Sequence, residues 1–458
     1  MNKKVDLTKG SIFKTIIVLS LPILGTSFIQ MAYSLVDMLW IGRMGSGALA
    51  AVGTAGFFTW FGNSLVMVTK TGAQVGVAQS IGEQNYKKKN KFIYNSIFMC
   101  IIMAVVYTLI LLLFKEKLIH FFNLGDEEVI SMAIEYLVIV SIGMICAFLN
   151  PQFTGIITAT GNSRVPFIVN TIGLITNIVL DPILIFGIGG IPSMGVAGAA
   201  IATVTAQFIV TILFVIVFIK MGYKFDKSKL RYIEKGIIGK IVKWGTPSAV
   251  QSCLFSFFAM LIGRIIAVWG PTPIAVQKLG SQIESISWMT AEGFSCALTA
   301  FIGQNYGAKK FDRVYKGYLE TVALASVLGT FATILLIFGG EWLFSLFISE
   351  PDAIKQGADY LRILGYSQLF MCLEITTTGA FFGVGKTMTP SIISVLFTGL
   401  RVPAAIILSR PEILGINGVW WSISSSSVFK GIILSTIFYF SVLRAIKLAR
   451  HHEDVILN

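Results

Sequence analysis

Apolar runs of about twenty residues recur throughout this chain. A helix needs about 20 mostly apolar residues to cross the hydrocarbon core of a bilayer. Because the runs have helix length and lack the short alternation of a membrane β-strand, they predict a polytopic helical membrane protein. With 55% hydrophobic and 13% charged residues, the chain is too apolar for a soluble globule. We predict an all-α fold of twelve transmembrane helices, at residues 12–40, 48–77, 92–114, 128–150, 164–188, 195–220, 237–269, 274–303, 314–340, 356–382, 388–409 and 415–442.

Basic residues gather in alternate connections between these runs. Residues 87–91, 220–243 and 309–316 are rich in lysine and arginine, whereas residues 187–195 and 270–273 contain neither. Cytoplasmic loops of membrane proteins carry such an excess. With an even number of spans, the asymmetry predicts that both termini are cytoplasmic. The formal charge of +13 is therefore a topology signal, and we predict no nucleic-acid partner.

Cysteine and histidine usage indicates no resident metal or catalytic centre. The five cysteines fall within apolar runs without a CxxC pair, and the three histidines are scattered outside the predicted spans. The sequence contains neither an HExxH nor a GxSxG motif. We therefore predict that the protein is not an enzyme and that it needs no cofactor.

The second half of the chain repeats motifs of the first. For example, Ile41-Gly42-Arg43 returns as Ile262-Gly263-Arg264, and all such pairs share an offset of roughly 220–225 residues. Each copy then holds six spans, so the copies are parallel, and transporters of this kind bind substrate between the repeats near the membrane midplane. We predict a first lobe over residues 1–219, a basic cytoplasmic linker over 220–236, and a second lobe with a cytoplasmic tail over 237–458.

One predicted span carries a carboxylate in its middle. Asp181 lies inside the apolar stretch from Phe167 to Ile188, where an ionised group costs at least about 2.5–3.5 kcal/mol. Asn177 lies four residues earlier and shares its helix face, and Pro182 removes a backbone donor. The group predicts an ion or proton site at membrane depth. The alternative is a buried aspartate whose hydrogen bonds are satisfied by neighbouring helices.

The first span ends in a polar ridge. Gln30, Tyr33, Ser34 and Asp37 follow one another at helical intervals. Together with Asp181, Asp37 would give the first lobe two carboxylates that can share a proton or a sodium ion. The alternative is a helix-end carboxylate exposed at the outer interface, since Arg43 follows six residues later.

The second half also has polar residues within its spans. Gln282 and Glu284 lie in the eighth span and Glu374 in the tenth. A buried pair of Lys278 with Glu284 that only fixes packing is the alternative for Glu284. Further cations within or beside apolar runs are potential counter-ions or interfacial residues, namely Lys70, Arg264, Arg401 and Lys430.

Several motifs together resemble those of multidrug and toxic compound extrusion (MATE) transporters. Asp37-Met-Leu-Trp-Ile-Gly-Arg-Met-Gly45, followed by Ala48-Leu-Ala-Ala-Val-Gly53, is similar to the first motif of that family. Later motifs of the family resemble Asn177-Ile-Val-Leu-Asp181-Pro182, Gly195-Val-Ala-Gly-Ala-Ala-Ile-Ala-Thr203 and Phe301-Ile-Gly-Gln-Asn-Tyr-Gly-Ala308. The resemblance extends over essentially the whole chain.

The resemblance implies two six-helix bundles that form a V and export organic compounds against an ion gradient. By it, Asp37 and Asp181 match the cation or proton site of the amino-terminal lobe, with Asn177 and Thr203 as neighbours. If sodium is the coupling ion, Asp37, Asn177 and Asp181 are its implied ligands.

One branch of the family differs from this sequence. NorM-type members carry an acidic residue on the seventh span, but Pro247 to Phe257 contains none. Glu374 lies near the acidic position of the tenth span. The resemblance therefore favours the amino-terminal site and the DinF-like branch.

The predicted function is a secondary antiporter in the cytoplasmic membrane of a prokaryote. It exchanges cationic or amphipathic organic compounds for H⁺ or Na⁺ by alternating access. Membrane lipid surrounds it, and a monomer suffices because both lobes belong to one chain. The residues predicted to line its substrate cavity are Gln30, Tyr33, Gln282, Glu284 and Glu374.

The alternative is a flippase for lipid-linked oligosaccharides with a similar two-lobe architecture. Such a protein needs a cationic cavity for the pyrophosphate of its substrate. Four cations keep this alternative open: Lys70, Arg264, Lys278 and Arg401.

Overall fold

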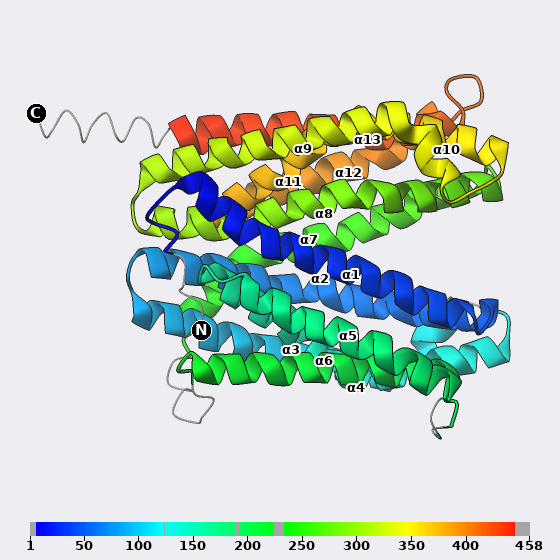
Figure 1. Ribbon diagram of the computed structural model, residues 1–458, viewed down its shortest axis with the longest axis horizontal. Coiled ribbons are helices and arrows are strands. Elements are labelled where there is room, and N and C mark those ends of the chain that lie inside the picture. The colour runs from blue at the N-terminus through cyan, green and yellow to red at the C-terminus, as the bar shows by residue number, and fades with distance from the viewer. Residues whose placement is uncertain (1–5, 123, 188–189, 191, 224–232, 445–458) are drawn as a thin grey trace, which may run out of the picture. The chain divides into compact units, whose positions relative to one another are not determined.

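All regular secondary structure in the described part of the chain is helical. The structure is a computed structural model that describes residues 6–122, 124–187, 190, 192–223 and 233–444, without the side chains of residues 34, 35, 38, 46 and 443. Figure 1 labels most of the helices. In chain order they are α1 (Ile12–Gly42), α2 (Ser46–Gly82), α3 (Tyr86–His120), α4 (Glu127–Ala159), α5 (Arg164–Phe186), α6 (Gly195–Lys220), α7 (Lys235–Ala267), α8 (Pro271–Gly307), α9 (Phe311–Ser345), α10 (Pro351–Gly365), α11 (Gln368–Gly383), α12 (Met388–Leu408), α13 (Ile416–Phe438) and the π-helical turn η2 (Tyr439–Leu443).

Each predicted span corresponds to helix, so the predicted all-α class is confirmed. The tenth span differs in one respect, because it is divided between α10 and α11. At the break, the Ser367 N–H donates to the Leu364 carbonyl at 3.0 Å, and Thr333 Oγ1 donates to the Gly365 carbonyl at 2.9 Å. A helix interrupted inside a membrane needs such partners, since no water reaches its freed backbone groups.

Two of the predicted spans are less apolar or less continuous than the rest. Ten helices of the described chain are long and apolar enough to cross a membrane, and neither α8 nor the divided α10–α11 is among them. α8 carries Lys278, Glu284 and Glu292, while α10 and α11 have only 15 and 16 residues. Burying polar groups at membrane depth costs free energy, and such groups usually belong to functional sites. These two spans are therefore expected to contribute to a functional site.

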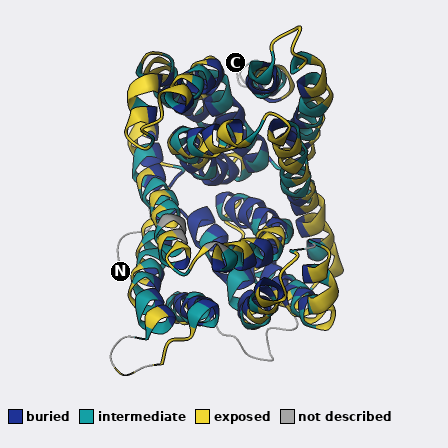
Figure 2. Ribbon diagram, turned by 90° about the vertical axis from the view of Figure 1, so that its right-hand side faces the viewer, coloured by how far each residue is buried: buried dark blue, intermediate teal, exposed yellow. Residues whose placement is uncertain are grey.

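The exposed faces of the long helices are apolar. On α3, Ile102, Val106, Leu109 and Leu113 are between 46% and 76% exposed and recur at intervals of three or four residues. Figure 2 shows how buried and exposed residues alternate around the other helices. A soluble protein rarely exposes a continuous apolar face of this kind, so these faces contact lipid. The protein is therefore a multi-pass membrane protein.

The described chain forms two compact units. The amino-terminal unit comprises Gly25–Val77 and Asn85–Ala249, and the carboxy-terminal unit comprises Met1–Leu24, Ala78–Gln84 and Val250–Asn458. The start of α1 thus belongs to the carboxy-terminal unit and the start of α7 to the amino-terminal unit. The lobe boundaries predicted from the repeat, which keep each span whole, stay a prediction. Residues 224–232 of the predicted linker and the predicted tail after residue 444 lie outside the described residues.

The start of α7 packs tightly within the amino-terminal unit. A Cβ atom placed on Gly245 would lie 1.8 Å from the carbonyl oxygen of Val68, so the backbones of α7 and α2 are in direct contact there. Just before α7, the Glu234 N–H donates to Asn95 Oδ1 at 3.0 Å, and the Glu234 carboxylate pairs with Lys91. Both contacts attach the start of the second repeat to helices of the first.

We expect Gly245→Ala to lower the free energy of unfolding by about 1–3 kcal/mol, the usual cost of overpacking a close contact. Gly239→Ala is the matched control, because a Cβ at Gly239 on the same helix meets no atom within 4 Å. The control should be neutral or slightly stabilising, since alanine favours the helix over glycine. Thermal unfolding of the purified protein in detergent measures both effects. Equal midpoints for the two variants would contradict the contact.

In the carboxy-terminal unit, a short segment before α1 is held by α8 and α9. Arg313 donates from Nη1 to the Gly10 carbonyl at 2.8 Å and from Nη2 to the Leu7 carbonyl at 3.2 Å. Asn305 donates from Nδ2 to the same Leu7 carbonyl at 3.0 Å, and its Oδ1 accepts from Arg313 Nε at 3.1 Å. We call residues 7–10 the amino-terminal strap. Its backbone carbonyls are thus paired with side chains of the second repeat.

Arg313→Ala should release this strap. We expect amide hydrogen exchange in residues 7–10 to accelerate about tenfold or more, because each lost charge-assisted hydrogen bond contributes about 1.5–3 kcal/mol. Lys316→Ala is the control, since Lys316 is exposed on α9. Hydrogen-exchange mass spectrometry measures both variants. Unchanged exchange in Arg313→Ala would show that the strap is held by other contacts.

Candidate functional site

The amino-terminal unit contains the predicted carboxylate pair. Asp181 on α5 is fully buried, and Asn177 on the same helix is 1% exposed. Asn177 Nδ2 donates to Asp181 Oδ1 at 3.1 Å. Asp37 lies near the end of α1, and its charge interacts with that of Asp181. The structure therefore brings together Asp37, Asn177 and Asp181, which the sequence places on two different spans.

Both carboxylates have an oxygen without a partner. Asp181 Oδ2 and Asp37 Oδ1 are buried, and no described residue donates a hydrogen bond to either. Burying an ionised carboxylate oxygen that accepts no hydrogen bond costs free energy, and binding of a proton or a cation removes that cost. One oxygen of Asp181 is therefore satisfied by a neighbour and the other is not, so an ion or proton site at Asp181 stays a prediction.

Neutral hydroxyl groups that could coordinate a cation lie near the two carboxylates. The Tyr33 hydroxyl is 3.1 Å from Thr203 Oγ1, so α1 and α6 meet at this point. Tyr136 of α4 is 7% exposed and interacts electrostatically with Asp37, Asp181 and Tyr33. Tyr136 could not be predicted from the sequence, because a single tyrosine in an apolar span carries no distinguishing signal. Thr203 contacts Tyr33 and, among the described residues, makes no hydrogen bond to either aspartate.

This arrangement can hold a proton or a hard monovalent cation. Carboxylate, amide and hydroxyl oxygens are the ligands that such cations prefer. No group of three or more histidine, cysteine or acidic side chains with metal-site geometry occurs among the residues that the structure describes. Any cation bound here would therefore be held by the two carboxylates together with neutral oxygens, and the Asn177 amide is already hydrogen-bonded to Asp181.

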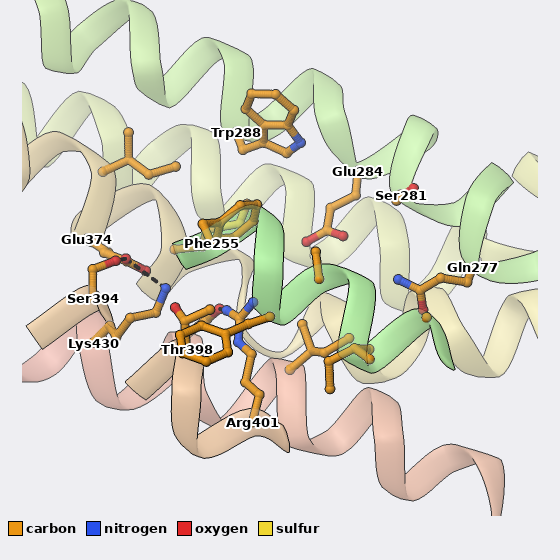
Figure 3. Close-up of a pocket in the computed structure, with 18 of the residues that line it drawn as sticks. Phe255, Gln277, Ser281, Glu284, Trp288, Glu374, Ser394, Thr398, Arg401 and Lys430 are labelled. Atoms are coloured by element: carbon orange, nitrogen blue, oxygen red, sulfur yellow. Dashed lines mark hydrogen bonds and ion pairs between the residues drawn. The ribbon is translucent and has the colours of Figure 1, made fainter. Parts of the chain in front are cut away.

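The carboxy-terminal unit contains a cavity of about 510 Å³ (Figure 3). Glu284 and Glu374, both predicted to line a cavity, are among its lining residues. Gln282 and Gln30 are not: Gln282 is exposed on α8, and Gln30 is exposed on α1 in the other unit. The apolar part of the wall comes mainly from α7, α8, α11 and α13, with Phe255, Phe258, Ile262, Trp288, Ile375 and Ile423.

A buried ion pair closes one side of this cavity. Lys430 Nζ lies 2.8 Å from Glu374 Oε1, and the two side chains are only 5% and 9% exposed. Ser394 Oγ also donates to Glu374 Oε1, at 3.4 Å. Lys430, which the sequence predicts as a potential counter-ion, is thus the partner of Glu374 (Figure 3).

Glu284 has neutral partners instead of the predicted lysine. Gln368 Nε2 donates to Glu284 Oε1 at 2.8 Å, while Lys278 is exposed and forms no ion pair with Glu284. The alternative of a buried Lys278–Glu284 pair is therefore wrong. Gln368 could not be predicted as this partner, because it lies 84 residues from Glu284 along the chain, at the start of α11.

Arg401 is the second cation of the cavity. Its Nε donates to Ser426 Oγ, and its Nη2 donates to Ser427 Oγ at 3.1 Å. The run of serines at 424–427 inside an otherwise apolar span is a signal that could have predicted this polar face. Four cationic residues supported the alternative prediction of a flippase, and of these only Arg401 lines the cavity. Lys278 and Arg264 are exposed, and Lys70 belongs to the other unit.

Comparison with known proteins identifies the family. A sequence profile of the MatE family matches residues 22–183 and again residues 247–407, one match in each half of the chain. The chain belongs to the MatE family. Its members are transporters, so this MatE protein is a transporter and not an enzyme, as predicted. The two profile matches also agree with the internal repeat.

Individual relatives of this MatE protein cover almost its whole length. The probable multidrug resistance protein NorM of Thermotoga maritima is 29% identical over 437 residues, which are 93% of this chain and 92% of that protein. The probable multidrug resistance protein YoeA of Bacillus subtilis is 26% identical over 422 residues, which are 90% of each chain.

Solved structures show the same fold. A MOP superfamily transporter from Pyrococcus furiosus superposes with a TM-score of 0.88 at 23% identity, covering 98% of this MatE protein and 99% of that chain. An outward-facing multidrug resistance MATE family transporter superposes equally well, with a TM-score of 0.88 at 22% identity. These likenesses confirm the predicted twelve-helix fold of two six-helix bundles.

Proposed function

We propose that this MatE protein is an efflux antiporter that exports cationic or amphipathic organic compounds in exchange for H⁺ or Na⁺. The single observation that supports the proposed ion coupling is that Asp37 and Asp181 each have a buried carboxylate oxygen that accepts no hydrogen bond from any described residue. The export of drugs is supported by the relatives from Thermotoga maritima and Bacillus subtilis, both named as probable multidrug resistance proteins.

The coupling ion acts by neutralising this pair. Two carboxylates that lie close together and out of water repel each other when both are ionised. A protein state in which a proton or a cation can reach and neutralise them is therefore stabilised. Coupling requires that the ion and the substrate bind the two states with different affinities, because equal affinities shift no equilibrium. In this proposal ion binding at Asp37 and Asp181 favours the state that releases substrate outside. Return to the inward-open state discharges the ion into the cytoplasm.

The amino-terminal site is proposed as the only coupling site, as in the DinF-like branch. Two features support this assignment. The α7 stretch from Pro247 to Phe257 has no acidic residue. In the carboxy-terminal unit, the charge of Glu374 is already balanced by Lys430. Glu374 therefore does not need a coupling cation for neutralisation. The protein is proposed to reside in the cytoplasmic membrane of a prokaryote with both termini cytoplasmic.

Proteoliposomes that contain the purified protein test the proposal. A fluorescent organic cation is loaded, and a pH gradient and a sodium gradient are imposed separately, each with and without the ionophore that collapses it. We expect one of the two gradients to drive dye movement and the matching ionophore to abolish it. Dye movement that ignores both gradients would disprove ion-coupled antiport.

A further inference from the structure

The cavity of the carboxy-terminal unit holds four charged side chains that do not all pair with one another. Glu374 and Lys430 form a contact ion pair at 2.8 Å, and both are nearly excluded from solvent. Their charges cancel locally, so a ligand in the cavity meets them as one neutral, dipolar group. The charges left to a ligand are those of Glu284 and Arg401.

These two residues are held apart. No ion pair within 4.0 Å joins Glu284 to Arg401, although their charges interact. Neutral side chains hold each of them: Gln368 donates to Glu284, and two serines accept from Nε and Nη2 of Arg401. No described residue accepts a hydrogen bond from Arg401 Nη1. Figure 3 shows the two side chains entering the cavity from α8 and α12.

We propose that this cavity binds a zwitterionic amphipathic molecule, with its anionic group on Arg401 and its cationic group on Glu284. The inference rests on the proposed function as an exporter of small molecules and names a substrate class for it. The apolar frame of the ligand packs against aromatic and aliphatic wall residues such as Phe255, Phe258 and Trp288. A volume of about 510 Å³ is within the range of sites for drug-sized ligands.

Ligands of a single charge fit this cavity less well. A simple cation paired with Glu284 displaces water from the site and leaves the guanidinium of Arg401 desolvated next to a like charge. A simple anion bound to Arg401 leaves the carboxylate of Glu284 desolvated next to a like charge. Burying a charge without a partner is costly, so the two residues together select against either partial match. A zwitterion satisfies both and brings no net charge into the membrane.

Three fluorescent probes with one skeleton test the proposal. Nε-dansyl-lysine is a zwitterion, its methyl ester is a cation, and its Nα-acetyl derivative is an anion. Each is titrated into the full-length protein in detergent, and the rise in dansyl fluorescence reports binding in an apolar site. We expect the wild-type protein to bind the zwitterion about tenfold or more tightly than either derivative, since each derivative loses one charge-assisted contact.

Two substitutions should change this selectivity in opposite directions. Arg401→Gln removes the preference for the zwitterion over the ester, and Glu284→Gln removes the preference over the acetyl derivative. Matched controls are Arg264→Gln on α7 and Glu292→Gln on α8, because both residues are exposed and neither lines the cavity. If Arg401→Gln does not fold, Arg401→Lys retains the positive charge and should retain the zwitterion preference.

Two results would overturn the proposal. One is a wild-type protein that binds the ester as tightly as the zwitterion. The other is that Arg401→Gln and Glu284→Gln show the same selectivity among the three probes as the control variants. Because binding is measured without a gradient, the result is independent of ion coupling: Asp181→Asn should retain the zwitterion preference even where it abolishes antiport. Failure of the antiport proposal and failure of this one are therefore distinguishable.

Discussion

Asp181→Asn should strongly reduce or abolish ion-coupled exchange while leaving the fold intact. The amide matches the carboxylate in size and can still accept the hydrogen bond from Asn177 Nδ2, but it neither takes up a proton nor balances the charge of a cation. Coupling free energies of about 1–3 kcal/mol correspond to factors of about 5–150. We expect gradient-driven dye exchange in proteoliposomes to fall by a factor in this range or to disappear.

Asp352→Asn is the matched control for this experiment. Asp352 is exposed in the first turn of α10, so the same chemical change occurs outside the proposed site. Asp37→Asn should behave like Asp181→Asn, because in the proposed mechanism both carboxylates hold the same ion. Asp181→Asn that exchanges dye at the rate of the control would remove Asp181 from the coupling mechanism.

Lys430→Met should be among the most destabilising substitutions in the chain. It leaves the Glu374 carboxylate buried without its partner at 2.8 Å. Removing one member of a buried pair typically costs about 3–5 kcal/mol, whereas replacing both members is often close to neutral. We therefore expect a large drop in the thermal unfolding midpoint of Lys430→Met in detergent. The double variant Glu374→Gln/Lys430→Met should recover most of it.

An exposed pair provides the comparison. Arg362 and Asp359 lie 3.5 Å apart on α10, with side chains 51% and 41% exposed. Arg362→Met should change stability by less than about 1 kcal/mol, because exposed pairs are solvated and screened. If Lys430→Met and Arg362→Met lower the midpoint equally, burial of the Glu374–Lys430 pair has no energetic consequence and the pair is not a fixed element of the cavity.

Most of the helical architecture follows from the sequence because its causes are local. An apolar run of about 20 residues crosses a bilayer as a helix whatever its neighbours are, since the backbone has no other partners there. The link between Asn177 and Asp181 is also local, because residues four apart share a helix face. That both residues belong to one site could therefore be predicted from their spacing alone.

Contacts between spans are different, because they depend on how helices pack. Nothing in the spacing of residues selects Lys430 as the partner of Glu374, 56 positions away, or Gln368 as the partner of Glu284 in place of the nearby Lys278. The interruption between Gly365 and Gln368 likewise depends on Thr333 of a neighbouring helix.

The sequence by itself determined that the chain is a set of membrane helices with carboxylates in the first and fifth spans. Only the tertiary structure decided which buried charges form an ion pair with each other and which have neutral hydrogen-bond partners instead. The physical reason is that a charge in a medium of low polarity is stabilised by the particular groups within a few ångströms of it. Those groups come from helices whose order along the chain does not reveal their packing.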